Sequence, residues 1–267
     1  MATIYSARTG DRGSFVDGVS KVLDLAQIVK NRSILIKPNI VSAEPYPTTT
    51  HPETLRAVLN HVHGVAERIL VADGPAFESE FRLESHDLAG VCKEFNLDLV
   101  DLSAQKMRRV QTSSGFELEV SDLIFEFDVV VSLPVLKSHC ICSLTGALKN
   151  QYGLLSSREK RGLHFDGVKD IHKAIAELTR IRKPDIYVVD AVETLVKAQE
   201  RRHGGKRKKL GYMFAGTDPV ALDSYGLELL KQVEKRLKKA HPEDIQHIKH
   251  AVNLGLGETE FSLQSLQ

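Results

Sequence analysis

Short apolar runs alternate along this chain with longer segments in which apolar residues recur three or four positions apart. The longer pattern predicts amphipathic helices, and the short runs predict strands that are buried on both faces. Helical spacing predicts a helix over Ser14–Val29, and the run Ser33–Ile36 predicts a buried strand. The same patterns predict further helices at 51–63, 84–95, 168–180, 218–230 and 242–254, further strands at 68–72, 98–101, 128–132, 185–190 and 211–215, and a hairpin at 110–120.

This order of elements predicts an α/β fold with a mostly parallel sheet covered by helices on both faces, because parallel strands need crossover connections. The hairpin, marked by Ser114-Gly115, is a small antiparallel insertion. No internal repeat or low-complexity linker divides the 267 residues. We therefore expect a single α/β domain over residues 1–267.

Polar side chains recur where the predicted strands end. Lys37 and Asn39 follow one strand, Asp73 follows the next, and Asp190 and Asp218 follow two later ones. Sheets of this kind bind ligands at the carboxyl ends of their strands. We therefore expect these side chains to contribute to one composite site, although an N-cap role alone also explains Asp218.

The segment 133–164, which follows the strongest predicted strand, holds most of the candidate chemistry. Several cations and imidazoles stand there among small apolar residues, and such a group of cations requires an anionic ligand to offset its repulsion. The alternative is a solvated loop whose charges face water. The residues concerned are Lys137, His139, Lys149, Asn150, Lys160, Arg161 and His164.

Each residue type predicts a role. Imidazoles exchange protons near neutral pH, and a lysine near other cations binds its proton less tightly, so His139, Lys149 and His164 are the candidate catalytic residues. Anion binding is assigned to Lys37, Asn39, Lys137, Asn150, Lys160 and Arg161. The acids expected to orient these cations are Asp73, Asp190, Asp218 and Asp223.

Composition narrows the function classes. The net charge is +1, no apolar run is long enough to span a bilayer, and the first residues form no apolar signal segment, so we expect a cytoplasmic protein without membrane contact. Three cysteines without a CxxC pair predict no iron–sulfur cluster held by this chain alone. Phosphate-loop, dinucleotide-binding and serine-hydrolase motifs are absent from the sequence.

A basic run occupies 197–209, and we expect it to be a mobile solvated loop over the site. It contains no aromatic residue on which a base would stack, so nucleic acid is an unlikely partner. Binding to phosphates through Arg201–Lys209 stays open as an alternative.

Several motifs resemble, in order, those of the domain of unknown function 362 family. They are ILIKPNIV (34–41), HPETLRAVLNHV (51–62), LPVLKSH (133–139), LTGALKNQYG (144–153), KRGLH (160–164), PDIYVVDAVE (184–193), AGTDPVALD (215–223) and NLGLG (253–257). Many members of that family resemble fusions to ferredoxin-type segments. The resemblance therefore implies a ferredoxin-type partner for a chain that lacks such a segment.

The chain also resembles, more distantly, the lactate racemase family, whose members hold a nickel-pincer nucleotide. That resemblance implies that Lys149 tethers the cofactor, that His164 is a metal ligand and that His139 is a proton or hydride partner. The family's Gly-Thr-His loop has no counterpart here, since Asp73-Gly74-Pro75 stands at the equivalent strand exit. The cofactor, whether this nucleotide or another metal, stays unassigned.

Three functions follow as hypotheses. The first is an isomerase-like or redox enzyme that acts on a small carboxylate- or phosphate-bearing metabolite. The second is a non-catalytic cofactor-binding or redox accessory protein beside a ferredoxin, and the third is a nucleic-acid binder. The residues best support proton transfer beside a stabilised anion.

Overall fold

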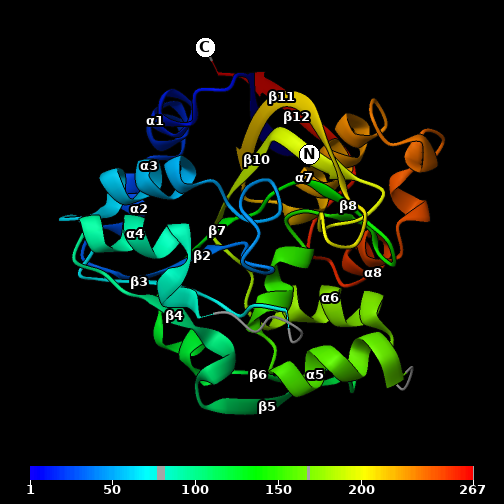
Figure 1. Ribbon diagram of the computed structural model, residues 1–267, viewed down its shortest axis with the longest axis horizontal. Coiled ribbons are helices and arrows are strands. Elements are labelled where there is room, and N and C mark those ends of the chain that lie inside the picture. The colour runs from blue at the N-terminus through cyan, green and yellow to red at the C-terminus, as the bar shows by residue number, and fades with distance from the viewer. Residues whose placement is uncertain (77–81, 167–168, 267) are drawn as a thin grey trace.

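The computed structural model describes residues 1–76, 82–166 and 169–266, and these contain an eight-stranded sheet between two layers of helices (Figure 1). The five strands from β10 to β4 in the sheet order pair in parallel, and β11 is antiparallel to both of its neighbours. The predicted mostly parallel α/β sheet is therefore confirmed. In sheet order the strands are β12 (Phe261–Ser265), β1 (Ala2–Arg8), β11 (Lys206–Gly216), β10 (Ile186–Val196), β7 (Val129–Leu133), β2 (Ser33–Pro38), β3 (Arg68–Asp73) and β4 (Leu99–Asp101).

Both faces of the central strands are buried, as their continuous apolar runs require. Along β2, Ile34 and Ile36 join the hydrophobic cluster on one face, and Leu35 joins the cluster on the other. Helices α1 (Arg12–Leu23), α3 (Pro52–Val62) and α4 (Asp87–Glu94) cover the first face. The second face is covered by α6 (Ile171–Ile181), α7 (Pro219–Leu230) and α8 (Gln246–Asn253).

The helix predicted over Ser14–Val29 is two helices. α1 ends at Leu23, Asp24 takes a left-handed conformation with φ of 49°, and α2 (Leu25–Val29) follows. The apolar spacing continues across this break, so it did not reveal the turn. The helix predicted from Val168 begins at Ile171, and Val168 itself lies outside the described residues.

Two small hairpins stand apart from the main sheet. β5 (Met107–Gln111) and β6 (Glu117–Ser121) form the predicted antiparallel insertion. A second hairpin, β8 (Lys137–His139) and β9 (Ser143–Thr145), follows β7. It holds Lys137 and His139 in regular structure where the sequence predicted only a loop.

The prediction of a loop over 197–209 is wrong for its last four residues, 206–209. Lys206–Lys209 begins β11 and pairs with β10 in the register Val196↔Lys206 to Glu193↔Lys209. These four side chains are exposed on the strand, so their charge is hydrated without any need for an irregular backbone. Only the turn before Lys206 is a loop.

The parallel strands bring distant segments to one edge of the sheet. β2 ends at Pro38, β3 at Asp73 and β7 at Leu133, and the residues that follow them lie side by side because these strands are neighbours in register. None of the helices in the described ranges has the length and apolar character that crossing a bilayer demands.

Candidate functional site

A cavity of about 220 Å³ lies at this edge of the sheet. Its walls come from the exits of β2 and β3, the β8–β9 hairpin, the 3₁₀ helix η4 (Lys149–Leu154), α5 (Ser157–Arg161) and the turn before β11. Eight of the residues predicted from sequence line it, namely Asn39, Asp73, Lys137, His139, Lys149, Asn150, Lys160 and His164. The structure therefore brings most of the predicted set together.

Lys37 and Asp73 form a buried ion pair at the exits of β2 and β3. Lys37 Nζ donates to Asp73 Oδ1 at 2.5 Å, and the backbone N–H of Ile40 donates to Oδ2 at 2.6 Å. Burial lowers the pKa of Lys37, and the Asp73 charge opposes that shift. Lys37 is not among the residues that line the cavity, and its ion pair among the described residues is with Asp73.

Glycine is required beside this pair. A Cβ on Gly153 would overlap Asp73 Oδ1 and lie 2.8 Å from Lys37 Nζ. A Cβ on Gly74 would lie 2.7 Å from Lys160 Nζ. The two glycines let η4 and the β3 exit approach closely enough to bury both amines.

Lys137 and Lys160 are held by oxygen atoms that leave part of each ammonium for a ligand. Lys137 Nζ donates to Asn39 Oδ1 at 2.7 Å and to the Thr48 carbonyl. Lys160 Nζ donates at 2.9 Å to the carbonyls of Gly74 and Pro75. An ammonium has three donors, so each retains one. Burial lowers the pKa of Lys137 to about 7 and that of Lys160 to about 8.

Lys149 differs from these two lysines. Within the described residues its Nζ has no hydrogen-bond acceptor, and its recorded contact is the face of the Tyr152 ring, 4.4 Å from the centroid. The side chain is 8% exposed, and burial lowers its pKa. Lys149 is therefore a buried amine at the cavity wall without a protein acceptor.

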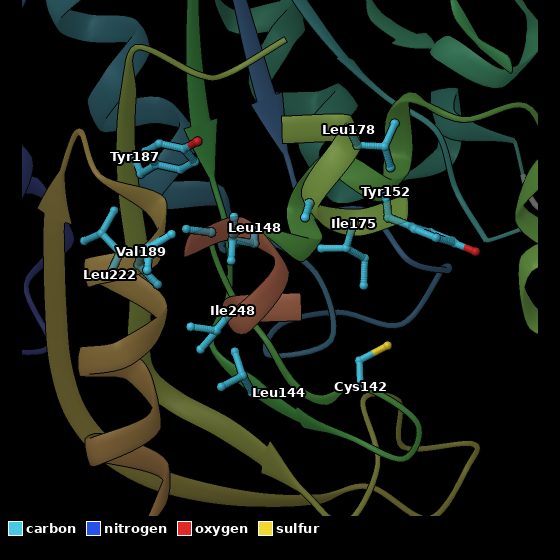
Figure 2. Packing of buried hydrophobic residues seen from close by; sticks show 14 of the residues in the cluster. Cys142, Leu144, Leu148, Tyr152, Ile175, Leu178, Tyr187, Val189, Leu222 and Ile248 are labelled. Carbon is cyan, nitrogen blue, oxygen red and sulfur yellow. The ribbon is translucent and has the colours of Figure 1, made fainter. Parts of the chain in front are cut away.

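The segment that carries Lys149 is fixed from behind. Figure 2 shows Leu148 and Tyr152 in the hydrophobic cluster with Ile175 and Ile248. Asp223 Oδ1 accepts from the Ala147 N–H at 2.5 Å, and its Oδ2 accepts from the Leu148 N–H at 3.1 Å. Asp223 thus orients Lys149 through the backbone and not by an ion pair. Burial raises the pKa of Asp223 to about 7.

His139 is held as one tautomer. Its Nδ1 accepts from the backbone N–H groups of Ile141 and Cys142, both at 3.1 Å. The proton of the neutral ring therefore lies on Nε2. Burial and the nearby Lys149 charge lower the pKa of His139 well below its usual value. In this tautomer the Nε2–H of His139 can donate a hydrogen bond to a ligand.

His164 has the opposite tautomer. Its Nδ1 lies 2.8 Å from the Lys160 carbonyl, which can only accept, and 2.9 Å from the Tyr152 hydroxyl. The Nδ1 proton points to that carbonyl, and the lone pair lies on Nε2. His164 therefore has the basic nitrogen that proton abstraction or metal ligation requires.

Five of the predicted site residues do not line the cavity, and Lys37, described above, is one of them. Asp190 accepts from Arg12 Nε at 2.6 Å and from the Tyr46 hydroxyl at 2.6 Å, so the cation that it orients is Arg12. Asp218 caps α7 through the N–H groups of Val220 and Ala221. The other two are Arg161, which is exposed, and Asp223, described above.

Asn150 has a positioning contact and an unpaired oxygen. Its Nδ2 donates to Ser132 Oγ at 2.8 Å, and its Oδ1 is buried without a hydrogen-bond partner among the described residues.

Two of the residues at the cavity were not predicted from the sequence. They are Tyr152, which contacts Lys149 and His164, and Glu200, which lines the cavity. A tyrosine three residues after Lys149 on a helical segment was the available signal for the first of these.

The donor set limits which metal centre fits. The described ranges contain no group of three His, Cys, Asp or Glu side chains able to hold a metal ion. A metal held by protein side chains alone therefore does not fit the described part of the cavity. A metal complex that supplies its own ligands, such as a nickel-pincer nucleotide, would have His164 Nε2 as its protein ligand and Lys149 as the neighbouring amine.

Comparisons with known proteins agree with this fold. A family model described as "Domain of unknown function (DUF362)" matches residues 34–228. A thylakoid-associated protein of Synechocystis is 25% identical over 204 residues, which are 74% of this chain and 63% of that protein. The chain thus spans less than two thirds of this curated relative.

Solved structures show the same fold at low identity. The lactate racemase apoprotein of Thermoanaerobacterium thermosaccharolyticum superposes with a TM-score of 0.57 and 16% identity, over 87% of this chain and 58% of that one. A Thermotoga maritima protein has a TM-score of 0.50 and 12% identity, over 83% of this chain and 57% of its own. At these identities the likeness establishes the fold alone.

Proposed function

This chain belongs to the DUF362 family, and from that premise we propose that it is an enzyme that binds a small carboxylate- or phosphate-bearing metabolite and transfers a proton at a carbon near that group. A racemase or epimerase performs chemistry of this kind. One observation carries the proposal: three buried amines, Lys137, Lys149 and Lys160, line one cavity. Among the described residues, the carboxylates that line the cavity are Asp73 and Glu200, and they already pair with Lys37 and Arg202. A bound anion supplies the missing charge.

Polar residues that line the cavity have proposed roles in binding and in proton transfer. The remaining donors of Lys137 and Lys160 bind the anionic group. His139 Nε2–H donates to a ligand oxygen and stabilises charge that develops there, and His164 Nε2 accepts the proton. A nickel-pincer nucleotide, if bound, would supply hydride chemistry in place of proton abstraction. The lactate racemase of the same fold makes a 2-hydroxy acid the first substrate to test.

Anion binding is the first test. We expect phosphate and L-lactate to bind by calorimetry, and Lys137→Met to weaken both by about tenfold to a hundredfold, since a hydrogen bond from a charged donor contributes about 1.5–3 kcal/mol. Lys208→Met is the matched control, because Lys208 is exposed on β11 and lines no part of the cavity. Equal loss in both variants, or no binding by the native protein, would contradict the proposal.

The same affinity should depend on pH. The ammonium form of Lys137 binds the anion, and its pKa in the free protein is about 7. Binding must take up a proton above that pH, so affinity should fall by up to about tenfold per pH unit as pH rises beyond 7. Asp223 also titrates near pH 7. A step that disappears in Lys137→Met assigns the effect to Lys137, and a step that persists there assigns it elsewhere.

Proton transfer is tested by isotope exchange. We expect deuterium from heavy water to enter L-lactate at C2 or pyruvate at C3, followed by NMR. His164→Gln removes the accepting lone pair and should slow exchange by about a hundredfold or more. His203→Gln is the control, because His203 lies at the cavity rim and has no role in the proposed step. Exchange at an unchanged rate in His164→Gln would show that His164 is not the base.

Location and partners remain predictions. We propose a cytoplasmic location, and because the relative from Synechocystis is thylakoid-associated, separation of membrane and soluble fractions tests it. A ferredoxin-type partner is likewise proposed only from the family resemblance.

A further inference from the structure

We propose that the metabolite carries an aldehyde or ketone as well as its anionic group, and that Lys149 holds it as an imine. The inference rests on the proposed function, because it needs the anion site to place the carbonyl. It concerns Lys149, the cavity amine for which the described residues offer no hydrogen-bond acceptor.

Lys137, Lys149 and Lys160 differ in the hydrogen bonds that their amines make. Lys137 and Lys160 each donate to two protein oxygens, which favours their ammonium forms. Within the described residues the Lys149 amine has no acceptor and its recorded contact is the Tyr152 ring; the side chain is more than nine-tenths buried and lines the cavity. A neutral amine tolerates that position better than an ammonium, and a neutral amine is the nucleophile in imine formation.

The fold fixes the backbone that precedes Lys149. Asp223 accepts from the two backbone N–H groups that precede Lys149, and a Cβ on Gly146 would overlap the Asp223 carboxylate. Glycine at that position therefore allows the cap that positions the amine. A lysine needed only for general positive charge would gain nothing from such fixation.

Imine formation at Lys149 balances in atoms and protons. The Lys149 nitrogen lone pair bonds to the carbonyl carbon, and one N–H proton moves to the oxygen to give a carbinolamine. The second N–H proton leaves with that hydroxyl as water, and a C=N bond remains. In the proposed step the His139 Nε2–H donates to the developing oxygen, and His164, which like Lys149 contacts Tyr152, takes up and returns the proton.

The imine also explains why proton transfer would be feasible. A protonated C=N group withdraws electrons from the adjacent carbon, so a C–H bond there becomes acidic enough for an imidazole to act on. The same amine thus serves the reaction that the anion site and His164 were proposed to perform.

Borohydride trapping tests the imine. Full-length protein is incubated with pyruvate or glyoxylate and then with sodium borohydride, and intact mass and peptide mapping follow. We expect one adduct per chain, heavier by the probe less one oxygen, on Lys149. Acetone, which has the carbonyl but no anion, should give far less, and L-lactate should compete. Lys149→Met should lower trapping by at least about tenfold, while Lys208→Met should not change it.

The outcomes separate the two proposals. Trapping on Lys149 supports the imine, and peptide mapping of the native protein gives this answer even if the Lys149→Met variant misfolds. Calorimetric binding of L-lactate and phosphate without an adduct on Lys149 overturns the imine and leaves the anion site intact. An adduct spread over exposed lysines also overturns the imine. Absence of any anion binding overturns the proposed function itself.

Discussion

Gly153→Ala should lower the free energy of unfolding by about 3 kcal/mol or more, because the new methyl group has no space and the buried ion pair must move. Its Cβ would overlap Asp73 Oδ1 and lie 2.8 Å from Lys37 Nζ. Neither neighbour can withdraw, since Asp73 also accepts from the Ile40 N–H and Lys37 is fully buried. Urea unfolding measures the loss, and anion affinity should fall with it because η4 carries Lys149.

Gly90→Ala is the matched control. Gly90 lies inside α4, is exposed, and has no atom within 4 Å of the position that its Cβ would take. Alanine favours the helix by about 1 kcal/mol over glycine, so this variant should be more stable than the native protein. The same substitution would then have opposite effects at the two sites. If Gly153→Ala leaves the free energy of unfolding unchanged, η4 shifts freely, and the close approach of Gly153 to Asp73 does not constrain the fold.

The fold could be predicted where local sequence decides it. The central strands are continuous apolar runs, and their burial on both faces dictates a sheet between helix layers. β1 and β12 were missed, because each is only partly buried and they pair with each other across almost the whole chain. The sequence pattern near either strand does not indicate that β1 and β12 pair. The break at Asp24 was missed because the apolar spacing continues beyond it.

The sequence predicts where the site lies, but it does not predict which side chains pair with one another there. Neighbouring parallel strands end at one edge, so polar residues after β2, β3 and β7 had to be close together. The choice of Arg12 as the partner of Asp190 depends on how α1 packs, which no spacing near either residue reveals. The tautomers of His139 and His164 depend on backbone atoms that the sequence does not place.

Asp73→Asn should destabilise the protein by about 3–5 kcal/mol near neutral pH, because it leaves Lys37 as an uncompensated buried charge. The fully buried Lys37 ammonium has Asp73 Oδ1 as its carboxylate contact, at 2.5 Å. The loss should be measured by urea unfolding. Glu94→Gln, which removes the exposed bidentate pair with Arg56, is the control and should have little effect.

The pH dependence of this loss has a definite sign. Burial lowers the pKa of Lys37 in the folded protein, and removal of Asp73 lowers it further, while the unfolded chain keeps the ordinary value. Between the lowered pKa in the folded protein and the ordinary value, the unfolded state binds more protons, so the stability of Asp73→Asn should rise with pH there. Its deficit relative to the native protein should shrink as the pH rises through the lowered pKa of Lys37. Adding Lys37→Met should restore part of the stability, because the stranded charge is gone. A double variant as unstable as the sum of the single ones would show that Asp73 stabilises this edge of the sheet mainly through the Ile40 N–H, and that the ion pair is secondary.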